Sequence, residues 1–227
     1  MSESRQAAAI LLVLCLVAAP VGAQQRGEVS ARGFATLGGL LFSAKDSFET
    51  VFGDPLGIVF GGGVQVLFPH GFYVESGVSW FRREGERVFV APNEEVFRLG
   101  IPMRVTLTPI EITGGWRFVR RPAVARPPLR IGARPSALVP YVGGGYSWMR
   151  YQEESNFSEE DDDLNDWFSG FHVIGGVEYR VRPTVAVGGE VGWSSIPDAL
   201  GAGGASAAFG EDNLGGTTFR LRVTFGR

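Results

Sequence analysis

The feature that most constrains this chain is a repeated alternation of apolar and polar residues, because a period of two is the period of a β-strand. Residues 218–225 show it most clearly, in the order Thr-Phe-Arg-Leu-Arg-Val-Thr-Phe. Each such segment has one apolar face and one face that carries charge. The pattern predicts eight strands, near residues 28–43, 56–68, 71–84, 103–118, 138–152, 168–182, 184–195 and 217–226.

Two of these segments depart from strict alternation. In the first, the apolar residues between Phe34 and Phe42 do not keep one parity, so its inward face stays undecided. In the fourth, the parity changes around Thr108 and Pro109, and proline cannot donate a hydrogen bond to a neighbouring strand. This change predicts a β-bulge that accommodates the proline.

The links between the predicted strands differ in length. Short turns lie near residues 69–71 and 182–183. Four links are long, namely 44–55, 85–102, 153–167 and 196–216. Short turns at one end and long loops at the other are typical of bacterial outer-membrane barrels. The Arg- and Pro-rich link 119–137 breaks the rule, because it is long but falls on the short-turn side.

A segment of a different kind precedes the strands. Residues 7–19 are continuously apolar, a basic residue stands before them, and a small-x-small ending leads to Ala23. This order predicts a secretory signal peptide at residues 1–23, cleaved after Ala23, and a barrel domain at 24–227. Cys15, the one cysteine of the chain, lies inside the signal. We therefore expect a mature chain without disulfides, thiolate catalysis or thiolate metal sites.

The composition of the chain and the positions of its aromatic residues indicate whether the barrel lies in water or in a membrane. Apolar residues make up 44% of the chain, which excludes disorder, and a net charge of −3 offers no basic field for nucleic acid. Aromatic side chains gather at strand ends, as in the girdles of membrane barrels. They are Phe72, Trp80, Trp116, Phe118, Tyr146, Trp148, Phe171, Tyr179, Trp193 and Phe225. These features favour a barrel in lipid over a soluble, lipocalin-like barrel whose apolar faces point inward.

The polar strand faces carry charges of both signs. In a narrow eight-stranded membrane barrel these charges point inward, where they must pair to offset their desolvation. We therefore predict a lumen charge network formed by Glu75, Glu111, Arg117, Glu178, Arg180, Arg182, Glu190, Arg220 and Arg222.

Three segments resemble a known family. Residues 108–118, Thr-Pro-Ile-Glu-Ile-Thr-Gly-Gly-Trp-Arg-Phe, and 139–146, Val-Pro-Tyr-Val-Gly-Gly-Gly-Tyr, look like neighbouring strands of the outer-membrane protein W family. Residues 175–179, Gly-Gly-Val-Glu-Tyr, resemble the broader outer-membrane protein A/X-like barrels. The resemblance implies an eight-stranded antiparallel barrel in the bacterial outer membrane, with both termini in the periplasm. It also implies insertion by the barrel assembly machinery and contact with outer-membrane lipid and lipopolysaccharide.

Candidate catalytic and metal-binding residues are few. His70 lies in a turn and His172 on a polar strand face, and neither belongs to the His-x-Ser pair of outer-membrane lipid A deacylases. A carboxylate near His172 is more typical of a lumen salt bridge, so we expect no enzyme, no cofactor and no metal site. The acidic run at 153–166 lacks the ligand order of a calcium-binding loop, which favours a solvated surface loop.

Different classes of function remain open. The favoured one is a monomeric structural or surface-binding barrel with a lumen plugged by paired charges and with long extracellular loops. The alternative is a transporter or narrow channel for small solutes, including hydrophobic ones. An apolar patch near the outer rim would serve it, and the sequence offers Phe81, Val88, Phe89 and Val90 there. A soluble periplasmic lipocalin-like binding protein is the second alternative.

Overall fold

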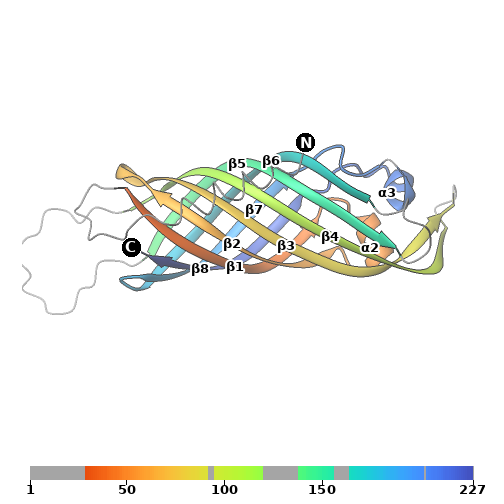
Figure 1. Ribbon diagram of the computed structural model, residues 1–227, viewed down its shortest axis with the longest axis horizontal. Helices are drawn as coiled ribbons and strands as arrows, with labels where there is room; N and C mark the ends of the chain where they lie inside the picture. Colours follow the sequence, from red (N-terminus) through yellow and green to blue (C-terminus); the bar gives the residue numbers. More distant parts are fainter. Residues whose placement is uncertain (1–28, 92–94, 120–137, 156–163, 202, 227) are drawn as a thin grey trace, which may run out of the picture.

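A computed structural model describes residues 29–91, 95–119, 138–155, 164–201 and 203–226. These residues form one closed barrel in which each strand pairs with its neighbours in the sequence and β8 pairs with β1 (Figure 1). All pairs are antiparallel, which confirms the predicted fold class. The strands are β1 (Ser30–Phe42), β2 (Leu56–Leu67), β3 (Phe72–Val90), β4 (Val96–Arg117), β5 (Leu138–Ser155), β6 (Leu164–Arg182), β7 (Val185–Ser195) and β8 (Gly216–Gly226).

Two helices lie in the links at one end of the barrel. Helix α2 (Lys45–Phe52) connects β1 to β2, and α3 (Gly204–Phe209) lies between β7 and β8. Figure 1 shows both at the same end, which we call the helix end. The opposite end, where Pro69–Gly71 and the β6–β7 turn lie, is the turn end. Within the described part of the chain, neither helix is long and apolar enough to cross a membrane.

The wall of the barrel is taller on one side than on the other. Strands β3, β4, β5 and β6 have 18 to 22 residues, whereas β1, β2, β7 and β8 have 11 to 13. The extra length projects at the helix end. The prediction of one long loop over 85–102 was wrong, because most of that link is strand, and the two ends of the predicted 153–167 loop are also strand, while residues 156–163 lie outside the described residues. Cross-strand partners such as Val88 with Arg98 and Val90 with Val96 continue the ladder beyond the predicted ends.

The predicted bulge at Pro109 is also wrong. Val78 pairs with Ile110 and Phe81 with Leu107, so the β3–β4 register does not shift past the proline, and Pro109 itself pairs with Met149. From Met103 to Arg117 the inward side chains of β4 are the odd-numbered ones. The apolar pattern changes faces because the inner face becomes apolar toward the helix end, while the backbone keeps its parity. The register shift in this hairpin lies between Glu86 and Val88.

The first strand, whose inward face the sequence left undecided, turns its even-numbered residues inward. Arg32, Thr36, Leu40 and Phe42 are buried, whereas Leu37 is exposed on the outside. Phe34 also points inward, where its ring lies 3.8 Å from the guanidinium carbon of Arg222. The strand therefore places polar and apolar side chains on the same inner face.

In the part of the barrel that all eight strands form together, the outer surface is apolar around the whole circumference. Ile58 is 74% exposed and Leu221 is 70% exposed, and all ten aromatic residues predicted at strand ends are exposed. Soluble proteins rarely expose contiguous apolar surface of this extent. The polar lumen and apolar exterior are the reverse of a soluble lipocalin-like barrel and fit the hydrocarbon of a bilayer.

Above this band, toward the helix end, the pattern reverses. Outward positions become polar, as at Arg82, Arg104 and Gln152, while inward positions become apolar. The inward side chains form one buried cluster with residues of α2 and of the β7–β8 link. Its members include Leu40, Phe42, Phe48, Val59, Phe81, Val105, Leu107, Met149, Ile196 and Leu214. The helix end is therefore built like a soluble barrel on top of a membrane barrel.

Candidate functional site

The lumen near the turn end is held together around Glu178. Both carboxylate oxygens of Glu178 accept hydrogen bonds from Arg32, at 2.8 and 2.6 Å, and one also accepts from Arg117 at 2.7 Å. All three side chains are buried. Hydrogen bonds between ionised groups are the strong ones, and burial removes the water that would otherwise compete for them. Gln65 accepts from Arg32 at 2.7 Å and donates to Glu75 at 2.6 Å, which links this cluster to the next one.

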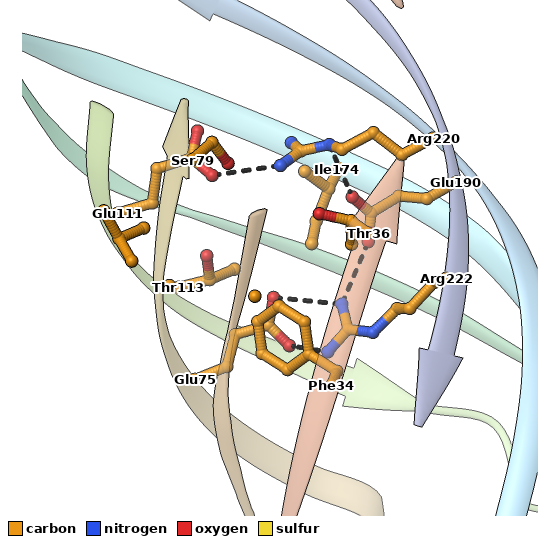
Figure 2. A pocket seen from close by; sticks show the side chains of 13 residues that line it. Phe34, Thr36, Glu75, Ser79, Glu111, Thr113, Ile174, Glu190, Arg220 and Arg222 are labelled. Atoms are coloured by element: carbon orange, nitrogen blue, oxygen red, sulfur yellow. Dashed lines mark hydrogen bonds and ion pairs between the residues drawn. The ribbon is translucent and has the colours of Figure 1, made fainter. Parts of the chain in front are cut away.

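Arg222 is the centre of the second cluster. Its guanidinium donates to Glu75 at 2.7 and 3.2 Å and to Glu190 at 3.1 Å (Figure 2). The ring of Phe34 covers one face of the same guanidinium. Tyr141 donates its hydroxyl to Glu190 at 2.9 Å. A planar group that is bonded at its edge and covered on its face has little freedom to move.

Arg220 carries the network toward the helix end. It forms ion pairs with Glu190 at 3.1 Å and with Glu111 at 3.2 Å, as the dashed lines in Figure 2 show. The charges along the lumen thus alternate from Arg117 at one end to Glu111 at the other. Four arginines and four glutamates take part, so their formal charges cancel.

Every strand contributes a side chain to this lumen network. The contributors are Arg32, Gln65, Glu75, Glu111 with Arg117, Tyr141, Glu178, Glu190, and Arg220 with Arg222, in the order β1 to β8. The structure does not bring Arg180 and Arg182 into the network. Both are exposed at the turn end, because β6 leaves the lumen just after Glu178 and its last residues reach water.

Sequence reasoning missed Arg32 and Gln65. The uncertain parity of the first strand hid Arg32, although Arg32 stands two positions before Phe34 and four before Thr36 on the same face. Gln65 carries no charge and therefore gave no signal in a search for ion pairs. A search for all polar residues at inward parity would have found both.

A neutral hydrogen-bonded trio lies beside the network. His172 Nδ1 is 2.8 Å from the Ser147 hydroxyl and Nε2 is 2.7 Å from the Thr113 hydroxyl. All three residues are almost fully buried. Because a neutral imidazole has one donor and one acceptor nitrogen, both ring nitrogens are satisfied by these two hydroxyls. The predicted position of His172 on an inward strand face agrees with this arrangement.

The lumen leaves almost no free space in either of its layers. Beside the charge network, the cavity bounded by Glu75, Glu111 and Arg222 has a volume of about 10 Å³. In the apolar layer above it, the space bounded by Phe81, Leu107 and other residues is about 30 Å³. A volume of about 10–15 Å³ holds one water molecule. Among the described residues, these two spaces have room for isolated waters only.

A much larger cavity lies at the helix end, between the tall wall and the two helices. Its volume is about 440 Å³. The lining is mostly apolar and comes from α2, β3, β4, β5, β6 and the β7–β8 link, with Phe48, Val51, Phe52, Val88, Leu99, Met103, Val105, Leu164 and Leu200 among its members. We call it the mouth cavity. Val88, predicted as part of an apolar patch near the rim, lines it, whereas Phe81 lies deeper in the buried cluster and Phe89 is exposed.

The charged and phenolic groups that line the mouth cavity are paired with one another. Tyr151 donates its hydroxyl to Glu153 at 2.8 Å, and Arg87 lies 3.9 Å from the same carboxylate. Burial, followed by the nearby charge of Glu153, raises the pKa of the Tyr151 phenol. The phenol therefore stays protonated and remains a donor at neutral pH.

The outer face of the tall wall carries its own ion pairs in water. Arg104 donates to Glu84 at 2.6 Å and to Glu154 at 3.2 Å across three strands. The hydrogen bond from Arg104, then its charge, lowers the pKa of Glu84. Ion pairs this exposed add little to the stability of the fold. Their presence indicates that the outer face of the tall wall is in contact with water.

Glu211, a residue of the β7–β8 link, holds the first turn of helix α2 in place. The Glu211 carboxylate accepts hydrogen bonds from the backbone N–H groups of Asp46 and Ser47, at 3.1 and 2.9 Å, and from the Ser47 hydroxyl. It satisfies donors at the start of the helix that have no partner within the helix. Phe48, one turn into α2, stacks on Phe42 of β1 with ring centroids 3.7 Å apart. The two long links are thereby joined above the barrel.

A comparison with models of known protein families identifies the family to which this barrel belongs. The model of the outer membrane protein β-barrel domain family matches residues 9–225. The chain belongs to this family. It is an integral protein of the outer membrane, and the apolar band seen on its surface is its lipid-facing side. A search of curated protein sequences found no match.

Several solved structures resemble this outer-membrane barrel. Ail of Yersinia pestis, crystallised with the heparin analogue sucrose octasulfate, is 12% identical, with a TM-score of 0.49 over 88% of this chain and 99% of that one. Neisserial surface protein A is 13% identical, with a TM-score of 0.46 over 88% and 97%. The E. coli outer membrane protein W is 15% identical, with a TM-score of 0.39 over 90% and 100%.

Several predicted features of the barrel protein lie outside the described residues. They are the signal peptide at 1–23 with its cleavage after Ala23, most of the Arg- and Pro-rich link, and the acidic residues at 156–163. Among the residues that the structure does describe, no group of His, Cys, Asp and Glu side chains is arranged to hold a metal ion.

Proposed function

We propose that this protein is a closed, monomeric outer-membrane barrel with a structural or surface-binding role. Its helix end is the part that binds ligands at the cell surface. The observation that carries the proposal is the filled lumen. Three buried arginines and the partly buried Arg220 are neutralised by four glutamates from opposite sides of the barrel, and an apolar layer lies above them. An ion that entered would have to separate buried charge pairs and then cross apolar packing, and both steps are costly.

The same packing argues against an enzyme. Ser147 and His172 are the residues that most resemble a nucleophile and its base, but they lie within the lumen, below the apolar layer. Substrate would have no path to them, and the Ser147 hydroxyl is engaged with a ring nitrogen whose partner nitrogen is bonded to Thr113. Nucleophilic catalysis needs access as well as a base within reach. We assign the trio to packing of the lumen.

Partners follow from the position of the barrel. We propose that the apolar band contacts outer-membrane lipid and that the charged outer face of the tall wall, at Arg82, Arg104 and Arg150 just beyond this band, faces lipopolysaccharide head groups. Insertion by the barrel assembly machinery is expected for a barrel of this kind. We propose no nucleic acid, metal or cofactor as a partner.

Planar-bilayer recording of the purified full-length protein tests the closed lumen. We expect no steady conductance steps under conditions in which a general diffusion porin, added as a positive control, conducts. The variant Arg222→Ala should remain silent, because the apolar layer is independent of the charge network. Steady steps from the unaltered protein would overturn the proposal.

The transporter alternative keeps one supporting observation, the mouth cavity. A hydrophobic solute could enter that cavity from outside, but the packed lumen gives it no way down. Transport would therefore require a lateral exit through the wall into the bilayer. Accumulation of a hydrophobic solute inside proteoliposomes that show no conductance would favour this alternative.

A further inference from the structure

The mouth cavity has the size and enclosure of a binding site. Its floor is the buried apolar cluster that contains Phe42, Phe48 and Val105. The tall wall of β3 to β6 forms one side, and α2 with the β7–β8 link forms the other. A volume of about 440 Å³ falls within the range of about 300–1,000 Å³ found for small-molecule sites.

The chemistry of the lining selects an apolar body. Side chains such as Val51, Leu99 and Met103 offer contact area without hydrogen-bonding groups. Among the described residues that line the cavity, the charged ones are Arg87 and Glu153, which form an ion pair and have opposite formal charges. A strongly anionic or cationic ligand would have to disrupt this pair, whereas an uncharged polar end could remain beside it.

We propose that the mouth cavity binds the apolar part of one small amphiphile, such as an alkyl chain with an uncharged or zwitterionic end that lies near Arg87 and Glu153. This inference rests on the proposed function, because the closed lumen makes the cavity a receptor site with no exit below. The apolar chain can come from two sources, a membrane lipid or a free solute.

Two neighbouring residues provide a matched pair of variants. Val88 lines the cavity and Phe89 is exposed beside it, so Val88→Asp and Phe89→Asp introduce the same charge on opposite faces of one strand. Both positions lie above the lipid-facing band, where barrel closure does not depend on them. Retained heat-modifiability in SDS will show that each variant is folded.

The test uses the full-length protein in nanodiscs of zwitterionic lipid, with empty nanodiscs subtracted. The uncharged fluorophore N-phenyl-1-naphthylamine reports occupancy, and straight-chain alcohols of increasing length displace it. We expect affinity to rise about fourfold for each added methylene until the cavity is full. Val88→Asp should weaken displacement at least tenfold, whereas Phe89→Asp should stay within twofold of the unaltered protein. A cavity-filling variant, Val51→Trp, should move the end of the rise to a shorter alcohol.

Extraction of the purified protein identifies the source. A lipid recovered in stoichiometric amount from the unaltered protein, and lost from Val88→Asp, supports a membrane lipid. Saturable fluorophore binding without such a lipid supports a free solute. Equal signals from Val88→Asp and the unaltered protein would mean that the fluorophore resides in the bilayer, which overturns this inference. The conductance result stands apart, since a silent bilayer with no cavity binding leaves the closed lumen intact.

Discussion

At the scale of single residues, the lumen is a set of buried charges that are stable only as a complete network. Glu178 accepts three hydrogen bonds from two arginines, and neither arginine has water to replace them. Removing one member of a buried pair leaves the other charge without a counterion, and this costs more than the pair itself contributes. The effect of a substitution should therefore depend on burial far more than on the number of ion pairs lost.

We predict that Glu178→Gln destabilises the folded barrel by about 3–5 kcal/mol. Urea unfolding from lipid vesicles, followed by tryptophan fluorescence, measures the change. The matched control is Glu86→Gln, which removes the exposed partner of Arg98 and should change the free energy of unfolding by less than about 0.5 kcal/mol. Equal effects from the two variants would show that the lumen admits enough water to solvate its charges.

Glycine is required at Gly176, where the ring of Tyr141 lies against the backbone of β6 inside the lumen. A Cβ atom at Gly176 would lie 2.5 Å from the Tyr141 hydroxyl and 2.7 Å from the Gly189 carbonyl oxygen. A Cβ atom at Gly189, the neighbouring outward position, would meet nothing within 4 Å. The hydrogen bond from Tyr141 to Glu190 depends on this close approach.

We expect Gly176→Ala to lower the free energy of unfolding by about 1–3 kcal/mol, because the ring of Tyr141 must move. Gly189→Ala should be close to neutral. The same vesicle unfolding assay compares them, and a neutral Gly176→Ala would mean that the ring has space to shift.

At the scale of elements, the sequence predicted all eight strands but not how far four of them extend. The rule of apolar outside and polar inside holds only within the lipid-facing band. Beyond Trp80 and Trp148 the solvent outside changes from lipid to water, so the outward residues become polar and the inward ones apolar. If the rule of apolar outside and polar inside is applied to the whole strand, this reversal looks like a bulge or the end of the strand. The predictions of a bulge at Pro109 and of a loop at 85–102 were wrong for this reason. The helices could not be predicted, because their amphipathic faces are short and belong to a core shared with β1 and β3.

Helix α2 depends on a carboxylate that is distant in sequence. We predict that Glu211→Ala weakens the first turn of α2 by about 1 kcal/mol, the usual cost of losing an N-terminal cap. Hydrogen exchange of residues 45–52 should then accelerate about fivefold. Glu49→Ala, on the exposed face of the same helix, should leave the exchange of the first turn unchanged. No acceleration in Glu211→Ala would show that stacking of Phe48 on Phe42 suffices to hold the helix.

At the scale of the whole molecule, stability comes from closure. In the part of the barrel common to all eight strands, each strand is paired on both sides, so this part has no open edge at which a denaturant could begin. We predict that the protein in the outer-membrane fraction migrates as a compact band in SDS without boiling and shifts after boiling. Electrophoresis of paired samples makes the comparison. An unshifted band would contradict a closed ladder.

The reversal of faces along β3 also fixes how deep the protein sits. Val78 and Trp80 face outward in the apolar band, and the next outward residues are Arg82 and Glu84. Sliding by one outward position, about 7 Å along the strand, would either draw Arg82 into the hydrocarbon or lift Trp80 into water. The barrel cannot adjust its height to suit the membrane. In a thicker or thinner bilayer the lipids around it must deform instead, so this protein dictates the local thickness of its membrane.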